Sequence, residues 1–214
     1  MYAQFWAATF CCILGCLPVV GADRSGSPES AVVVYLAAPI PQSALPYLRH
    51  EAQTLLESAG YSVEWRDASN SRGLDASNLV VVDFDGDCNA PATPSTNAAP
   101  ASSGQRLAYA AVQDGAIAPF VRVDCGAVRA TLASLADREA PARRSYLYGR
   151  AIGRLIAHEL YHVLARTQDH APAGVGKPCF TAADLVAERF LFEAVALDRF
   201  RRGAADSTDA ADRR

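Results

Sequence analysis

The stretch GRLIAHELYHVLARTQDH, residues 153–170, decides the fold and the chemistry expected of this chain. Apolar residues recur through it at helical spacing, which predicts a helix that begins near residue 141 and carries the motif. His158 and His162 lie one turn apart on this helix, so both imidazoles leave the same face. Such a pair supplies two ligands to a tetrahedral Zn²⁺ ion, and Glu159 lies beside that ion without being forced to coordinate it.

A catalytic zinc site usually has three protein ligands and one open position. We expect the third ligand to be His170, in a loop of Asp, Pro and Gly residues that can fold back on the helix. Asp169 and Glu188 are alternatives. Glu159 is expected to act as the general base that takes a proton from a zinc-activated water.

The part of the chain before the motif predicts a sheet. Apolar or alternating segments indicate five strands, and a helix over 43–59 follows the first of them. The strand segments are 31–38, 61–67, 78–84, 106–115 and 118–125, the last two joined by an Asp-Gly turn as a hairpin. We expect an α+β fold, in which a twisted mixed sheet of about five strands with a crossover helix packs on the HExxH helix and a C-terminal helix.

A final helix is predicted from an N-cap at Thr181, with Asp184 three residues later, to about residue 201. The polar segment 203–214 is expected to be disordered. Residues 23–202 have the length of a single domain.

The N-terminal segment is nearly all apolar over residues 5–20 and ends in small residues. It predicts a secretory signal peptide over 1–22 and a secreted or periplasmic protein. The alternatives are a lipoprotein anchor at Cys16, within ILGC, or an uncleaved anchor. No other segment is apolar enough to span a membrane, so none is expected in the mature chain.

Three cysteines follow the signal segment, and an exported protein favours one disulfide among them. Cys88 and Cys125 each follow a predicted strand, so we expect these two to pair. Cys179 is then left over, as a buried thiol or, less favoured, as a metal ligand.

The formal net charge of −3 is mild, and no long basic run is present, so no nucleic-acid partner is expected. The oligomeric state is left open by the sequence.

HELYH with a downstream histidine, after a β-α-β-β-β pattern, resembles the zincin metallopeptidases, and among them the metzincin branch. The helix also resembles those of exported bacterial proteins with HELYHVLA-type motifs. The resemblance implies His158 and His162 as zinc ligands, Glu159 as the base, and an edge strand that aligns peptide substrates. The chain departs from HExxHxxGxxH at Ala165 and Gln168, and its only methionine is Met1, so the family's Met-turn is absent.

These features predict an exported zinc metalloendopeptidase that acts on peptides or proteins. One alternative is a non-catalytic zinc-binding or interaction module, in which Cys179 closes the site as a fourth ligand. Another is a hydrolase of the deformylase kind, with Cys88 or Cys125 as a ligand.

Overall fold

The computed structural model describes residues 30–37, 40–67, 79–89 and 106–211. Its sheet has five strands in the order β2-β1-β3-β5-β4. The first four strands in this order run parallel, and β4 is antiparallel to β5 at one edge. The strands are β1 (Ser30–Leu36), β2 (Tyr61–Asp67), β3 (Leu79–Asp85), β4 (Ala108–Gln113) and β5 (Ala116–Asp124). The predicted mixed sheet is confirmed.

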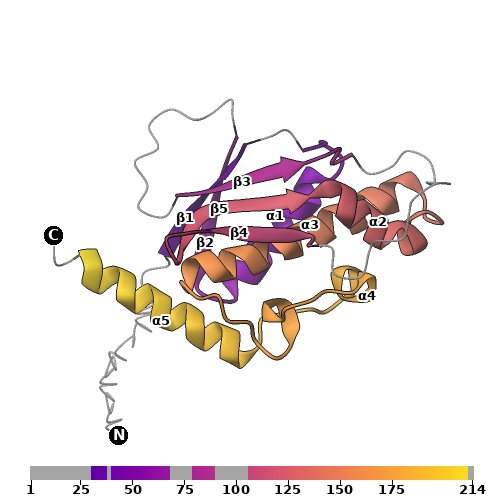
Figure 1. The fold of residues 1–214 in the computed structure, drawn as a ribbon. Helices are drawn as coiled ribbons and strands as arrows, with labels where there is room; N and C mark the ends of the chain where they lie inside the picture. Colours follow the sequence, from indigo (N-terminus) through magenta and orange to yellow (C-terminus); the bar gives the residue numbers. More distant parts are fainter. Residues whose placement is uncertain (1–29, 38–39, 68–78, 90–105, 212–214) are drawn as a thin grey trace, which may run out of the picture.

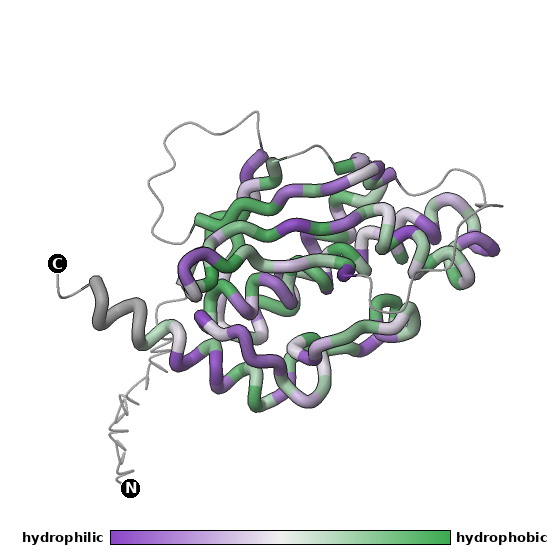
Figure 2. The backbone as a smooth tube through the Cα atoms, in the orientation of Figure 1, coloured by the Kyte–Doolittle hydropathy of each residue, from purple (hydrophilic) through white to green (hydrophobic). Residues whose placement is uncertain are grey.

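The helices are α1 (Leu45–Glu57), α2 (Cys125–Ala136), α3 (Pro141–Leu164), the 3₁₀ helix η2 (Gly174–Gly176), α4 (Ala182–Val186) and α5 (Ala194–Ala211). Figure 1 shows α1 and α3 beneath the same face of the sheet. Alternate strand residues such as Val34, Val82 and Val123 form one core cluster with Leu55 of α1 and Ile156 of α3. Figure 2 shows hydrophobic residues along the strands and more hydrophilic ones in the described part of α5.

Two glycines let α3 cross α1 at very short range. A Cβ atom on Gly149 would lie 2.4 Å from the carbonyl oxygen of Ala44, and one on Gly153 would lie 2.6 Å from that of Leu48. Only glycine fits where two backbones approach this closely. The crossing fixes α3, and with it the histidine motif, against the core.

The hairpin between β4 and β5 turns at Asp114 and Gly115, as predicted. Both residues have positive φ, 52° and 79°, which is the backbone of a two-residue type I′ turn. This turn places β4 at the edge of the sheet, where one side of its backbone carries no neighbouring strand from the described residues.

The predicted disulfide between Cys88 and Cys125 is present. It joins the segment after β3 to the end of β5, and these strands are parallel neighbours. The carboxyl ends of parallel neighbours lie at the same sheet edge, which is why the two cysteines meet.

Helix α2 was missed in the sequence. It begins directly after β5, where the Asp124 side chain accepts a hydrogen bond from the Ala127 N–H at 2.8 Å. An Asp N-cap before an Ala-rich segment was the local signal for it.

The prediction of one continuous last helix was wrong. Thr181 and Asp184 do form the expected capping box, but α4 ends at Val186 and α5 begins only at Ala194. Arginine side chains from α3 bind the backbone carbonyls of Asp184, Ala187 and Glu188, so these groups need no helical partner.

Helix α5 runs to Ala211, past the expected end near 201 and into the segment 203–214 that was expected to be disordered. The segment is rich in alanine, which has the highest helix propensity, and it contains no proline.

The expected signal peptide over 1–22 lies outside the described residues. A single domain over 23–202 stays a prediction. No helix among the described residues is both long and apolar enough to cross a membrane.

Candidate metal centre

Helix α3 buries its histidine motif. His158, Glu159 and His162 are 4%, 5% and 6% exposed, although most imidazoles and carboxylates remain near water. A buried polar group is costly unless it has a partner, so the partners of these three side chains decide what the site can do.

Each of the two helical histidines uses one ring nitrogen to bind the backbone. His158 Nδ1 lies 2.7 Å from the carbonyl oxygen of Val175, and His162 Nδ1 lies 2.7 Å from that of Thr167. Because a carbonyl only accepts, both Nδ1 atoms must carry the proton and donate. In neutral rings both Nε2 atoms are then unprotonated.

These two bare nitrogens face one another. His162 Nε2 lies 3.2 Å from His158 Nε2, and neither atom has a proton to share. Two lone pairs at this range repel unless a cation lies between them. Two nitrogens that each lie 2.0–2.1 Å from a tetrahedral Zn²⁺ are about 3.3 Å apart. The pair therefore fits a metal ion, and the fixed tautomers are those that ligation requires.

His170 completes the group. Metal-ligating atoms of His158, His162 and His170 all lie within 4.8 Å of one another. The His170 ring stacks on His158 with centroids 5.3 Å apart and stands edge-on to His162 at 4.7 Å. Its side chain is exposed, so it forms the outer side of the cluster.

The end of α3 is what brings the loop back. The N–H of Thr167 bonds to the carbonyl of His162, and the N–H of Arg166 bonds to that of Val163. This is a Schellman closure with Arg166 in the left-handed position, at φ 49°. The resemblance placed a glycine at 165, and here an arginine one residue later turns the chain.

Arg199 of helix α5 and Tyr161 of α3 stabilise this loop. Arg199 donates to the Tyr161 hydroxyl at 2.7 Å and to the carbonyl of Asp169 at 3.2 Å. The same hydroxyl donates to that carbonyl at 2.9 Å. The residue next to His170 is thus held by two donors, which fixes the direction in which the loop presents its histidine.

Burial keeps all three imidazoles neutral at ordinary pH. Desolvation, together with the neighbouring His162, lowers the pKa of His158 to about 3. Desolvation also lowers the pKa of His162. It lowers the pKa of His170 as well, although that side chain is less deeply buried. Metal ions bind neutral imidazole, so the cluster is prepared for ligation.

Glu159 lies beside the cluster. Its carboxylate Oε1 is 4.0 Å from His158 Nε2. Burial raises the pKa of this carboxyl to about 7, while a hydrogen bond from the Ala110 backbone and the charge of Arg106 oppose the rise. A carboxylate with a pKa near neutrality is well matched to accept a proton.

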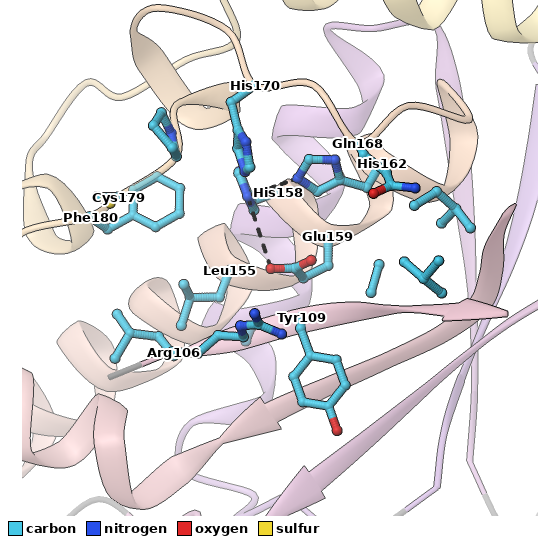
Figure 3. A pocket seen from close by; sticks show the side chains of 16 residues that line it. Arg106, Tyr109, Leu155, His158, Glu159, His162, Gln168, His170, Cys179 and Phe180 are labelled. Carbon is cyan, nitrogen blue, oxygen red and sulfur yellow. Dashed lines mark hydrogen bonds and ion pairs between the residues drawn. The ribbon is translucent and has the colours of Figure 1, made fainter. Parts of the chain in front are cut away.

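The cluster opens into a cavity of about 500 Å³. Figure 3 shows His158, Glu159, His162 and His170 along it, with Phe180 on one side and Arg106 and Tyr109 on another. Edge strand β4 forms one wall through residues 108–110, and the segment 178–180 forms another.

Sequence reasoning missed Arg106, Tyr109 and Phe180 as lining residues. They come from segments far from the motif in the chain, and no local pattern marks them. Only the packing of β4 and of the loop after η2 on α3 brings them to the cavity.

The alternative ligands lie outside the histidine group. The Asp169 carboxylate lies 3.8 Å from Arg199 and is 80% exposed. Glu188 is exposed, and its carbonyl accepts from Arg150. Cys179 lines the cavity but does not belong to the group, and it is exposed, so the expected buried thiol was wrong. Since Cys88 and Cys125 form a disulfide, neither supplies the thiolate of a deformylase-type site.

No protein-family model matches this chain, and no curated protein matches it. Among solved structures, its fold is similar to the crystal structure of an archaemetzincin from Methanopyrus kandleri, with a TM-score of 0.50 and 12% identity over 84% of this chain and 98% of that chain. At this identity the likeness concerns the fold alone. The mixed sheet with its helices matches an archaemetzincin-like fold, in agreement with the predicted α+β fold class.

Proposed function

We propose that this chain is an exported zinc-dependent metallopeptidase. His158, His162 and His170 hold the metal, and Glu159 is the general base. The observation that carries the proposal is the pair of unprotonated Nε2 atoms 3.2 Å apart, with a third imidazole within reach and a buried carboxylate beside them. The archaemetzincin-like fold supports it, because the motif itself resembles the metzincins.

A bound Zn²⁺ ion supplies a Lewis acid, which polarises a carbonyl oxygen and makes water more acidic. The chain's own groups do the rest. The Glu159 carboxylate takes the proton of a water in the cavity, and that water attacks the scissile carbonyl carbon. Glu159 then gives the proton to the leaving amine.

Edge strand β4 is suited to hold the substrate. Within the described ranges, one side of its backbone has no neighbouring strand, and its residues 108–110 line the cavity together with Glu159. An extended peptide adds to such an edge through main-chain hydrogen bonds. We therefore expect a peptide bond, rather than an isolated small ester or amide, to lie beside the carboxylate.

Export is supported by the Cys88–Cys125 disulfide, since disulfides persist in oxidising compartments. It agrees with the apolar segment at residues 5–20.

The test is Glu159→Gln. The amide keeps the shape of the side chain and cannot accept a proton, so peptide hydrolysis is expected to fall by about 10²–10⁴-fold. Metal content, measured by elemental mass spectrometry, is expected to stay at one ion per chain. Glu139→Gln, at an exposed glutamate, is the matched control. Full activity of the Glu159 variant, or no cleavage of any peptide by the metal-loaded wild type, would overturn the proposal.

A further inference from the structure

Few charged groups line the cavity, and they differ in how exposed they are to solvent. Among the described lining residues, Arg106 is the only lysine or arginine and Glu159 is the only carboxylate. Glu159 is 5% exposed and lies at the base of the cavity, whereas Arg106 is exposed. With neutral histidines, these two charges cancel, and a bound divalent cation leaves the cavity strongly positive. The whole chain carries the opposite sign, −3.

Arg106 forms no ion pair within the part of the chain that the structure describes. Among the described residues, no carboxylate lies within ion-pair distance of it. Its guanidinium lies 5.6 Å from the centre of the Tyr109 ring, on the adjoining strand β4. Figure 3 shows it directed toward the Glu159 end of the cavity, between Leu155 and Tyr109. The ring supports the guanidinium, and no described carboxylate occupies its N–H donors.

Apolar side chains also line the cavity. Leu107 follows Arg106, and Leu155, Pro178 and Phe180 line the same cavity. A carboxylate that enters the cavity beside these side chains loses part of its water, which strengthens its attraction to the guanidinium. Arginine suits this ligand, because its planar donors bind both carboxylate oxygens.

Resting on the proposed function, we infer that Arg106 selects substrates with a carboxylate next to the scissile bond. This carboxylate is an acidic side chain or the chain terminus itself. Because Arg106 lines the same cavity as Glu159, the residue it reads lies close to the bond that is cut. A lysine or arginine at that position meets a like charge and is rejected.

The experiment uses metal-loaded full chain and peptides that differ at single residues near the cleaved bond, with Glu, Gln or Lys. A second set compares a free C-terminal carboxylate with its amide. Wild type is expected to prefer Glu over Gln by about tenfold or more in kcat/KM, and to disfavour Lys. Arg106→Gln is expected to abolish this preference, and Arg106→Glu to invert it toward Lys. Arg138→Gln removes an exposed arginine that does not line the cavity, and is the matched control.

Binding of the same peptides, followed by fluorescence anisotropy, separates the two proposals. If wild type cleaves the Glu, Gln and Lys peptides equally, and Arg106→Gln changes no ratio, the inference is wrong while the peptidase stands. If no peptide is cleaved, the proposed function fails, and the charge preference in binding still decides the role of Arg106. A gain only in the free-acid set assigns the chain terminus as the carboxylate that is read, and a gain only in the Glu set assigns the side chain.

Discussion

Two pairs of buried polar residues lie on one stripe of α3, and they differ in the partners that their polar atoms have. Arg150 and Arg154 precede His158 and His162 at intervals of four residues, so each side chain lies about 40° round the helix from the one before it, and the four follow one stripe along α3. All are at most 9% exposed. The arginine guanidiniums bind groups within the chain, whereas the unprotonated Nε2 atoms of the two histidines face each other.

Each of the three guanidinium nitrogens of Arg154 donates a hydrogen bond within the chain. Its Nε donates to Glu51 of α1 at 2.7 Å, and its two terminal nitrogens donate to the carbonyls of Asp184 and Ala187, both at 2.6 Å. Arg150 lies 3.2 Å from the other oxygen of Glu51. This pair joins α1, α3 and the end of α4, so its function is structural.

The histidine pair is anchored only on one side. Both Nδ1 atoms donate to carbonyls, while both Nε2 atoms lack a proton donor. No group among the described residues donates to either Nε2 atom, so both lone pairs are free to bind a cation. The position of a residue on the helix therefore does not indicate its function here. The number of partners that its polar atoms have does indicate it.

The largest expected effect is on metal affinity at the histidine pair. In His158→Asn the side-chain amide keeps a donor for the Val175 carbonyl, in the place of Nδ1, and loses Nε2. Zinc affinity, measured by competition with a chelator, is expected to fall by about 10³-fold. Unfolding of the metal-free protein in urea is expected to change by less than about 1 kcal/mol.

His50→Asn, at the exposed histidine of α1, controls for the loss of an imidazole. A large loss of metal-free stability in the His158 variant would mean that the two pairs serve the same purpose.

The second effect is on stability at the arginine pair. Glu51→Gln leaves two buried guanidiniums without their carboxylate, which is expected to cost about 3 kcal/mol of unfolding free energy. Equilibrium denaturation in urea measures it. Glu57→Gln, at an exposed glutamate of the same helix, is expected to change little. A loss below about 1 kcal/mol for Glu51→Gln would remove the structural assignment of this pair.

The smallest effect concerns the turn that follows the histidines. Arg166 holds a left-handed backbone that glycine adopts without strain, so Arg166→Gly is expected to stabilise the protein by up to about 1 kcal/mol. Thermal melting of the metal-free protein measures the gain. Arg166→Ala removes the same side chain and keeps the Cβ atom. An equal gain in the alanine variant would contradict the backbone explanation.

Much of the fold could be predicted because local patterns decide it. The continuous apolar run of β3 predicts a buried strand, and the helical period in α3 is fixed by backbone geometry. The Asp114-Gly115 turn follows from which residues tolerate positive φ. The disulfide followed from two strand ends. The prediction of one continuous last helix failed because an arginine of α3, distant in sequence, donates to the carbonyl oxygens that would otherwise accept the hydrogen bonds of a continuing helix.

The sequence by itself determined that two imidazoles and a carboxylate leave neighbouring positions of one helix, since 3.6 residues per turn fix their directions. Only the tertiary structure decided that their Nε2 atoms face each other, that His170 returns to them, and that Arg106 lines the same cavity. Those relations join segments about fifty residues apart or lie across a loop. They depend on how the helix, the edge strand and the loop pack together, which no local period encodes.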